Sequence, residues 1–384
     1  MCLENRPPDT LAPLYHVDDS SDIYRKEVLM ENRVFVAECK DYDQEQVNAA
    51  VERVLDAFGG AKAIMECQPN GGKRVLVKPN ILIPKKPEDA ATTHPAVISA
   101  VCTAFIKAGA DVSIIDSTGG PHTKMLLRLL YGKPGIKKAA KECGAKLSFD
   151  TSIKTVPCTN GKMIQQVDLL SPVQDADLVI SVAKAKTHGF MSMTGCVKNM
   201  FGCVPGLGKP KLHRKFQKRE DFASMLIDIC QTVNPGFSIL DAVYGMEGPG
   251  PAGGDPKHLG AIIGGISPYA ADLAQSYLMG LRTDSVYTIQ EAAARGLVPD
   301  DPAQLTWLGD DAAKLRTSFK PASDSKKNTI PQILKNCTGC GDCARICPAD
   351  CIAIKERKAV ITEKECIKCY CCHEFCQEKA ILLE

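Results

Sequence analysis

The sequence predicts an α/β fold, in which a main domain built on a parallel sheet is followed by a small α+β domain rich in cysteine. From about residue 33 to residue 319, short apolar β-branched runs alternate with helical patterns, which is typical of a parallel sheet with crossover helices. Ten of the nineteen cysteines lie in the last 48 residues, after a polar stretch without apolar periodicity. We therefore expect an N-terminal extension at 1–32, the α/β domain at 33–319, a linker at 320–330 and the cysteine-rich domain at 331–384.

One βαβ unit near the start illustrates the pattern. Residues 74–77 read as a buried strand, and Thr93 is expected to cap the helix that follows. That helix ends at Gly109. Its apolar face consists of Ile98, Val101, Cys102, Phe105 and Ile106. The strand at 112–115 follows at once, so the crossover should be right-handed. Further strands of the sheet are predicted at 178–182, 237–240 and 259–263.

Composition and charge argue against several classes of protein. The 384 residues are 45% hydrophobic and 24% charged, which suits a globular protein with a sizeable core. A formal net charge of +2 gives no support to a nucleic-acid or membrane partner, and no apolar run is long enough for a transmembrane helix. Residues 1–28 lack the features of a secretory signal, so we expect a cytoplasmic protein whose cysteines are reduced or bind metal.

Eight cysteines near the end of the chain repeat one metal-binding pattern. The pattern is C-x2-C-x2-C-x3-C, and the second copy follows the first at an offset of 29 residues. The two copies are Cys337, Cys340, Cys343 and Cys347, and then Cys366, Cys369, Cys372 and Cys376. Three thiolates in one tight loop can bind three corners of a 4Fe-4S cluster, while the fourth cysteine reaches the other cluster. The spacing thus predicts two 4Fe-4S clusters, with Cys376 completing the first and Cys347 the second.

This region, residues 331–384, resembles the bacterial two-cluster ferredoxins, which implies a role in electron transfer. Gln377 departs from the pattern, since the first copy has Pro348 at the matching position. The alternative, a zinc ribbon or a disulfide knot, fits less well because zinc sites use paired C-x2-C motifs. Cys351 and Cys371 fall outside the repeat and are expected to be spare thiols. His373, beside a predicted ligand, is expected at the surface.

Polar clusters directly follow four predicted strands of the α/β domain. They begin at Lys78, at Asp116, at Lys184 and at Asp241. The carboxyl ends of parallel strands meet at one edge of a sheet, where α/β proteins bind ligands. Residues 178–219 also contain nine Lys or Arg and no Asp or Glu, and this excess of positive charge favours the binding of an anionic ligand. A solvated helix face is the alternative for the last basic residues of that segment.

The sequence therefore predicts an anion site at this edge of the sheet. The expected binding residues are Lys78, Asn80, Ser117, Thr118, Lys186, Lys198, Asn199 and Glu247. His188 is the first candidate for a proton donor, because a histidine can change its charge near neutral pH. Lys184 is the second candidate, and for both residues a role in binding alone is the alternative.

Familiar cofactor and catalytic motifs are missing from the α/β domain. Neither G-x-G-x-x-G directly after a predicted strand nor G-x4-G-K-[ST] occurs, so the dinucleotide and P-loop hypotheses lack their phosphate-binding loops. The sequence leaves open an unrecognised flavin site. It shows no Ser-His-Asp triad or carboxylate pair, and His122 and His258 are expected to be structural or exposed.

Six short motifs of the α/β domain together resemble the family called domain of unknown function 362. They are Val75-Leu-Val-Lys-Pro-Asn80, Thr92-Thr-His-Pro95, Asp116-Ser-Thr-Gly-Gly120, Lys184-Ala-Lys-Thr-His188, Lys198-Asn-Met-Phe-Gly202 and Glu247-Gly-Pro-Gly-Pro251. The resemblance spans nearly all of residues 33–320. Members of that family often carry a fused two-cluster ferredoxin domain, so both halves of the chain point to the same assignment. The family implies a fold and a site but no settled reaction.

Three functions follow from these patterns. The leading hypothesis is a cytoplasmic iron–sulfur oxidoreductase that takes electrons from a ferredoxin or similar donor and reduces a small anionic substrate. The second is a non-catalytic electron carrier or assembly factor whose basic segment docks an acidic protein. The third is a non-redox enzyme in which the clusters are structural.

Overall fold

The computed structural model describes residues 32–68, 71–322 and 329–383, and in these ranges the chain folds around one large mixed sheet. The order of its strands is β11-β1-β10-β9-β7-β2-β3-β4, and β8 pairs with β7. The strands are β1 Arg33–Glu38, β2 Arg74–Pro79, β3 Asp111–Ile114, β4 Lys146–Leu147, β7 Leu178–His188, β8 Ser192–Thr194, β9 Phe237–Glu247, β10 Asp255–Gly265 and β11 Thr306–Gly309. A small antiparallel pair lies apart from the sheet and consists of β5 Ile153–Pro157 and β6 Gln166–Leu170.

The predicted α/β class is confirmed, but the sheet is not parallel throughout. Strands β9, β7, β2, β3 and β4 are parallel to their neighbours in that order. Strand β10 runs antiparallel to both β9 and β1. The predicted strand at 259–263 therefore exists but runs in the opposite direction. Its connection from β9 is too short for a crossover helix, and only an antiparallel pair can be joined so tightly.

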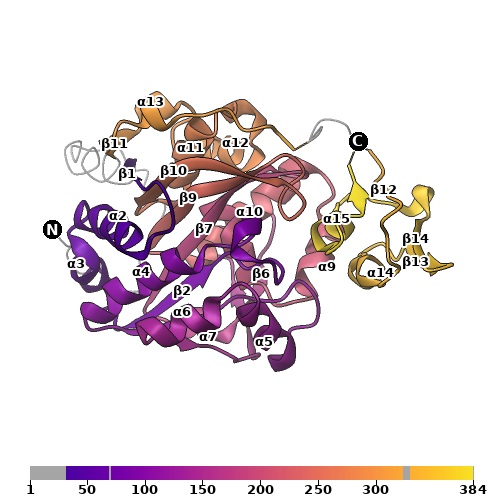
Figure 1. Ribbon diagram of the computed structural model, residues 1–384, viewed down its shortest axis with the longest axis horizontal. Coiled ribbons are helices and arrows are strands. Elements are labelled where there is room, and N and C mark those ends of the chain that lie inside the picture. Colours follow the sequence, from indigo (N-terminus) through magenta and orange to yellow (C-terminus); the bar gives the residue numbers. More distant parts are fainter. Residues whose placement is uncertain (1–31, 69–70, 323–328, 384) are drawn as a thin grey trace.

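Helices cover both faces of the sheet (Figure 1). They are α2 Gln44–Asp56, α3 Gly60–Glu66, α4 Pro95–Lys107, α5 Lys124–Gly132, α6 Ile136–Cys143, α7 Ser171–Asp175, α8 Cys196–Asn199, α9 Gly208–Lys215, α10 Arg219–Val233, α11 Pro268–Leu278, α12 Tyr287–Ala294 and α13 Ala312–Leu315. Side chains alternate along β2, so Val75 and Val77 pack in the core with α2 and α4, whereas Leu76 packs in the core with α10 and α11.

Helix α4 shows a small difference from the sequence prediction. His94, rather than Thr93, is its N-cap, because the His94 side chain accepts a hydrogen bond from the backbone N–H of Ala96. The Thr93 hydroxyl instead donates to the carbonyl of Val182 at 2.7 Å and so ties the loop after β2 to β7. The loop that carries Asn80 is thus fixed to the central strand of the site.

Residues 329–383 form a small C-terminal region with short helices and strands. Its elements are β12 Gln332–Ile333, α14 Asp342–Ile346, β13 Ile352–Lys355, β14 Lys358–Ile361, α15 Cys371–Phe375 and β15 Ile381–Leu382. In Figure 1, α15 lies toward α9 and the large sheet, while α14 and the β13–β14 hairpin lie farther away. Among the described residues, no helix has the length and apolar character needed to cross a bilayer.

Candidate functional site

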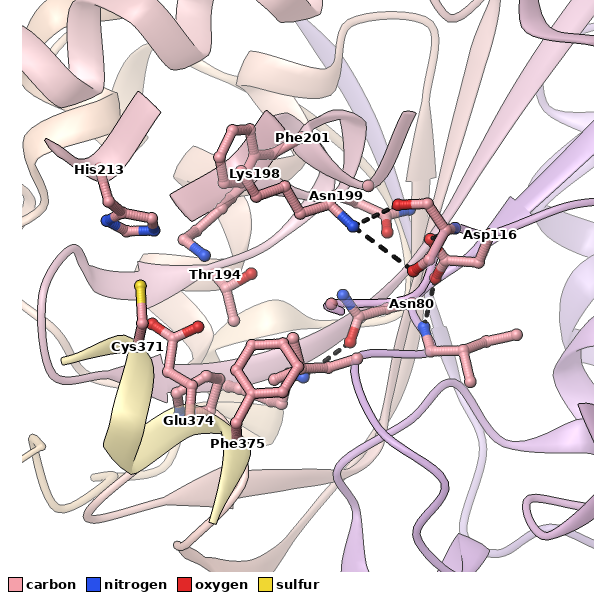
Figure 2. Close-up of a pocket in the computed structure, with 18 of the residues that line it drawn as sticks. Asn80, Asp116, Thr194, Lys198, Asn199, Phe201, His213, Cys371, Glu374 and Phe375 are labelled. Carbon is pink, nitrogen blue, oxygen red and sulfur yellow. Dashed lines mark hydrogen bonds between the residues drawn. The ribbon is translucent and has the colours of Figure 1, made fainter. Parts of the chain in front are cut away.

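A pocket lies where the C-terminal region meets the carboxyl edge of the sheet. Its volume is about 650 Å³ including its mouth. Four lysines of the α/β part line it, namely Lys78, Lys186, Lys198 and Lys209. Figure 2 shows Lys198 and His213 on one side, with Cys371, Glu374 and Phe375 facing them from α15. The site is therefore shared between two parts of the chain that are far apart in sequence.

Lys78 is held in place at the end of β2 by the carbonyl of Pro79, to which its Nζ donates at 2.6 Å, and by two side chains. Its Nζ lies 2.9 Å from Oδ1 of Asp116 and 3.2 Å from Oδ1 of Asn199. Asn199 in turn donates to the carbonyl of Lys78 at 2.9 Å. A Cβ built on Gly202 would lie 2.5 Å from Nζ of Lys78, so this position needs glycine for the ion pair to form. Lys78 thus contributes a fixed positive charge, partly balanced by the Asp116 carboxylate.

Lys186 reaches the pocket from β7. Its Nζ donates to Oδ1 of Asn80 at 2.7 Å and to the carbonyl of Ala91 at 2.8 Å. Neither partner is charged, so burial and then the nearby charges of Lys198 and Lys184 lower the pKa of Lys186 to about 7. Lys186 can therefore gain or lose a proton near neutral pH.

Lys198 and His213 offer polar atoms without a partner in the described part of the chain. No hydrogen bond or ion pair is formed by the half-buried Lys198 ammonium, which lies 5.9 Å from the centre of the Phe201 ring. Nδ1 of His213 is buried and has no hydrogen-bond partner among the described residues. Burial lowers the pKa of His213 to about 3, so this ring is neutral at physiological pH. An anion in the pocket could accept from the Lys198 ammonium.

Lys209 connects α9 to the loop after β3. Its ammonium donates to the hydroxyl and the carbonyl of Ser117 and to the carbonyl of Thr118. Burial lowers the pKa of Lys209 to about 8. Ser117 lines the pocket, whereas Thr118 turns its hydroxyl to the carbonyls of Gly120 and Pro121 and is not part of the lining.

His188 and Glu374 form the central polar contact between the two parts. Nε2 of His188 lies 3.1 Å from Oε1 of Glu374, and both side chains are buried. Nδ1 of His188 accepts from the backbone N–H groups of Phe190 and Met191, so the ring proton must be on Nε2. Nε2 lies close to the carboxylate, but the two atoms are not aligned as a hydrogen bond. Burial lowers the pKa of His188 to about 4. His188 itself is not among the residues that line the pocket.

The pKa of Glu374 is lowered despite its burial. Burial alone would raise it, but the neighbouring His188 and Lys198 stabilise the carboxylate and bring the pKa well below its ordinary value. Glu374 is therefore an anion that lies beside a neutral imidazole at physiological pH. It places one negative charge at the pocket wall that faces the lysines.

Lys184 and Glu247 lie outside the pocket. Lys184 is buried beside β9, where its Nζ lies 2.9 Å from Oδ2 of Asp241 and 2.6 Å from the hydroxyl of Tyr42. Oε2 of Glu247 accepts from the backbone N–H of Lys320 at 2.9 Å. The contacts of these two residues are with other parts of the α/β fold, so neither faces a ligand in the pocket.

Of the ten residues that the sequence suggests for the site, six therefore line the pocket together. They are Lys78, Asn80, Ser117, Lys186, Lys198 and Asn199. Lys209 and His213 also line the pocket, and both belong to the basic segment, but the sequence pattern does not single them out as site residues. Nothing in the sequence near Glu374 and Phe375 indicates that they would reach the α/β part.

Two further cavities in the C-terminal region are lined by the repeated cysteines. The first, of about 340 Å³ including space open to solvent, is lined by Cys337, Cys340, Cys343 and Cys376. The second, of about 300 Å³ on the same measure, is lined by Cys347, Cys366, Cys369 and Cys372, together with the non-repeat Cys351. Each set of four contains three cysteines of one copy of the motif and the last cysteine of the other.

No group of three or more His, Cys, Asp or Glu in the described ranges is arranged to hold a metal ion. The four cysteine ligands of a 4Fe-4S cluster surround eight atoms rather than one. Their sulfur atoms must therefore lie farther apart than the ligands of a single metal ion. Helix α15 contributes Cys372 to the second cysteine cavity and Cys371 to the lysine-lined pocket.

The prediction that His373 lies at the surface is wrong, because this ring is only 5% exposed and its Nε2 lies 3.1 Å from the carbonyl of Pro249.

Comparison with known proteins gives a family but no reaction. The chain is 28% identical over 283 residues to the thylakoid-associated protein sll1697 of Synechocystis sp., which covers 72% of this chain and 84% of that protein. A solved structure, the lactate racemase apoprotein from Thermoanaerobacterium thermosaccharolyticum, aligns at 12% identity with a TM-score of 0.42. That alignment covers 67% of this chain and 59% of the racemase chain. The family model described as domain of unknown function (DUF362) matches residues 75–276, more than half of the chain, and the chain belongs to this family.

Proposed function

We propose that the chain is an iron–sulfur oxidoreductase that reduces a small anionic substrate in the lysine-lined pocket. The observation that carries this proposal is the position of α15, the short helix Cys371–Phe375. One side of α15 supplies Cys372 to a cavity lined by four repeated cysteines, and another side supplies Glu374 and Phe375 to the pocket. A donor of electrons and an acceptor would thus be separated by a single turn of helix.

The cysteine cavities fit two 4Fe-4S clusters. Thiolates are the usual ligands of such clusters, and four line each cavity in the crossed arrangement that the repeat spacing predicts. When bound, a cluster of this kind accepts and donates one electron at a time. None of the eight repeated cysteines in the described residues forms a disulfide bond, which agrees with a reducing compartment and supports a cytoplasmic location.

The charges in the pocket favour an anion. Four lysines face two carboxylates there, Asp116 and Glu374, so the formal excess is two positive charges when all four lysines are protonated. Lys198 has no ion-pair partner among the described residues and is the first candidate to bind the anionic group. Phe201 and Phe375 also line the pocket and give it apolar walls. We infer a substrate with one charged end and a small apolar body.

Reduction by two electrons also requires two protons. We propose Lys186 as a proton donor, because its ammonium lines the pocket and its pKa of about 7 lets it release a proton near neutral pH. Nε2 of His188 lies 3.1 Å from Oε1 of Glu374, so we propose that His188 orients that carboxylate rather than contacting the substrate. Lys184 is paired with Asp241 and is assigned a structural role.

The test is reoxidation of the reduced chain by small anions. The anaerobically reduced full-length protein is mixed with a panel of small carboxylates and phosphates, and its visible absorbance is followed. We expect one chemical class to reoxidise the protein at a saturable rate. Lys198→Met should raise the anion concentration needed for half of the maximal rate by roughly 10-fold or more, as expected for loss of a charge-assisted hydrogen bond. Lys215→Met, at an exposed position of α9, is the matched control and should behave as wild type.

Two outcomes would contradict the proposal. If no member of the panel reoxidises the protein, the chain is an electron carrier or an assembly factor rather than a reductase. If Lys198→Met retains wild-type half-saturation, the substrate does not bind in this pocket.

A further inference from the structure

The two cysteine cavities differ in their exposure to solvent. Cys369 and Cys372 of the second cavity are buried, and that cavity lies on the α15 side of the C-terminal region. Cys340 of the first cavity is exposed. In Figure 1, α14, which carries Cys343 of the first cavity, lies farther from the large sheet than α15 does. The first cavity is thus open to a partner, while the second is adjacent to the pocket.

We propose that the surface around Cys340 docks an acidic one-electron carrier protein. We call this surface the outer face and define it by Cys340, Ile354, Lys355, Arg357 and Lys358. The inference rests on the proposed function, since a docked carrier is useful only if electrons pass on toward the pocket. In each encounter the carrier loses one electron and this chain gains one, so no other co-reactant is needed.

The turn of the β13–β14 hairpin lies beside the loop that carries Cys340. A Cβ built on Gly339 would overlap the backbone of Arg357, so the turn and the loop are in direct contact. Ile354 lines the first cavity and is 38% exposed, which leaves an apolar surface next to the exposed cysteine. Partners that exchange electrons must bring their centres close together, and an apolar spot at the point of contact allows close packing.

The charges on the β13–β14 hairpin beside this apolar spot are mostly positive, although Asp342 and Glu378 line the cavity itself. Lys355, Arg357 and Lys358 are exposed and form no ion pair with another described residue, and Glu356 is the single carboxylate among residues 352–361. The nearby Arg345 is already paired with Asp342. A basic rim of this kind attracts an acidic partner and can raise the association rate by about 10- to 1,000-fold at low salt. The occupant we infer is therefore an acidic carrier of the ferredoxin type.

The experiment compares two triple variants of the full-length, cluster-loaded protein. The outer-face variant carries Lys355→Glu, Arg357→Glu and Lys358→Glu. The control carries Lys137→Glu, Lys138→Glu and Lys141→Glu on α6, where the change of charge is the same and all three side chains are exposed. An acidic plant-type ferredoxin, reduced beforehand, is the electron donor, and the second-order rate of electron transfer is measured by stopped flow at low ionic strength.

We expect the outer-face variant to accept electrons from ferredoxin at least about 10-fold more slowly than wild type, with the difference shrinking as salt is added. The control should keep the wild-type rate, and dithionite should reduce all three proteins to the same extent. Zero-length carbodiimide cross-linking should join ferredoxin carboxylates to Lys355 or Lys358.

The outcomes separate this inference from the function on which it rests. Equal ferredoxin rates in the two variants, or cross-links confined to other lysines, would overturn the docking surface. Tighter binding of the outer face to phosphatidylserine vesicles than to ferredoxin would also overturn it and identify a membrane surface instead. A wild-type protein that dithionite cannot reduce would overturn the proposed function itself.

Discussion

The imidazole of His188 and the carboxylate of Glu374 meet between the end of β7 and α15, with Nε2 3.1 Å from Oε1. The two residues are 186 positions apart in the sequence, and of the two only Glu374 lines the lysine-lined pocket. Because Nδ1 of His188 accepts from two backbone N–H groups, protonation of the ring would require both of those hydrogen bonds to break. The contact is therefore built for a neutral histidine.

The first prediction concerns the pH dependence of stability. The pKa of His188 is about 4 in the folded protein against an ordinary value of 6.5. Between these values the unfolded chain binds more protons than the folded one, so stability falls as the pH drops from 6.5 to 4. His188→Gln keeps an N–H group close to Glu374 but removes this titration, so the variant should lose less stability on acidification. The measurement is the anaerobic Tm at pH values of about 7 and about 5.

His258→Gln makes the same change at an exposed position and is the matched control. If wild type and His188→Gln lose the same Tm between the two pH values, the imidazole is not held neutral by its surroundings.

The second prediction concerns the close approach of Phe375 to Gly119. A Cβ built on Gly119 would overlap the Phe375 ring, whereas nothing lies within 4 Å of a Cβ built on Gly120. Gly119→Ala should therefore displace α15 from the pocket, and Gly120→Ala should not. Hydrogen–deuterium exchange measured by mass spectrometry should be faster in residues 371–377 of the first variant only. The same exchange rate in both variants would show that α15 does not pack on Gly119.

The third prediction separates cluster ligands from the spare thiol of the second cysteine cavity. Cys351 and Cys366 both line this cavity, but only Cys366 belongs to the repeated motif. Anaerobically prepared wild type should hold about eight iron and about eight sulfide atoms. Cys351→Ser should keep this content, while Cys366→Ser should lose roughly half of it. Iron and sulfide analysis decides the matter, and an iron loss in Cys351→Ser with none in Cys366→Ser would reverse the assignment.

The sequence predicts well which residues lie at the carboxyl edge of the sheet, because the end of each strand is marked by residues next to it in the sequence. Apolar runs followed by polar residues mark where strands end, and parallel strands bring those ends together. Lys78, Asn80, Lys186 and Lys198 are thus found in one pocket. The reversed direction of β10 is harder to predict, because an apolar run of this length reads alike in parallel and antiparallel sheets.

Other features depend on partners that are distant in sequence. Lys184 carries the same signal as Lys186, but it lies opposite Asp241 of β9 in the sheet register and is paired there. Glu374 has no distinctive signal, because its role depends on where the C-terminal region packs. The prediction that His373 lies at the surface fails for the same reason, because the packing of the C-terminal region places its ring against Pro249.

The last prediction concerns anion affinity and Lys186. This ammonium lines the pocket and its pKa is lowered to about 7, so its positive charge is lost as the pH rises through that value. Sulfate is a suitable ligand for the test because its own charge is constant across this range. We expect sulfate to bind about tenfold more weakly at pH about 8 than at pH about 6, as measured by isothermal titration calorimetry. Lys186→Met should bind sulfate weakly at both values, with the pH dependence largely removed, whereas Lys215→Met on the exposed face of α9 should retain it. A Lys186→Met variant with the full wild-type pH dependence would show that another group controls the charge of the pocket, and it would remove Lys186 as the proposed proton donor.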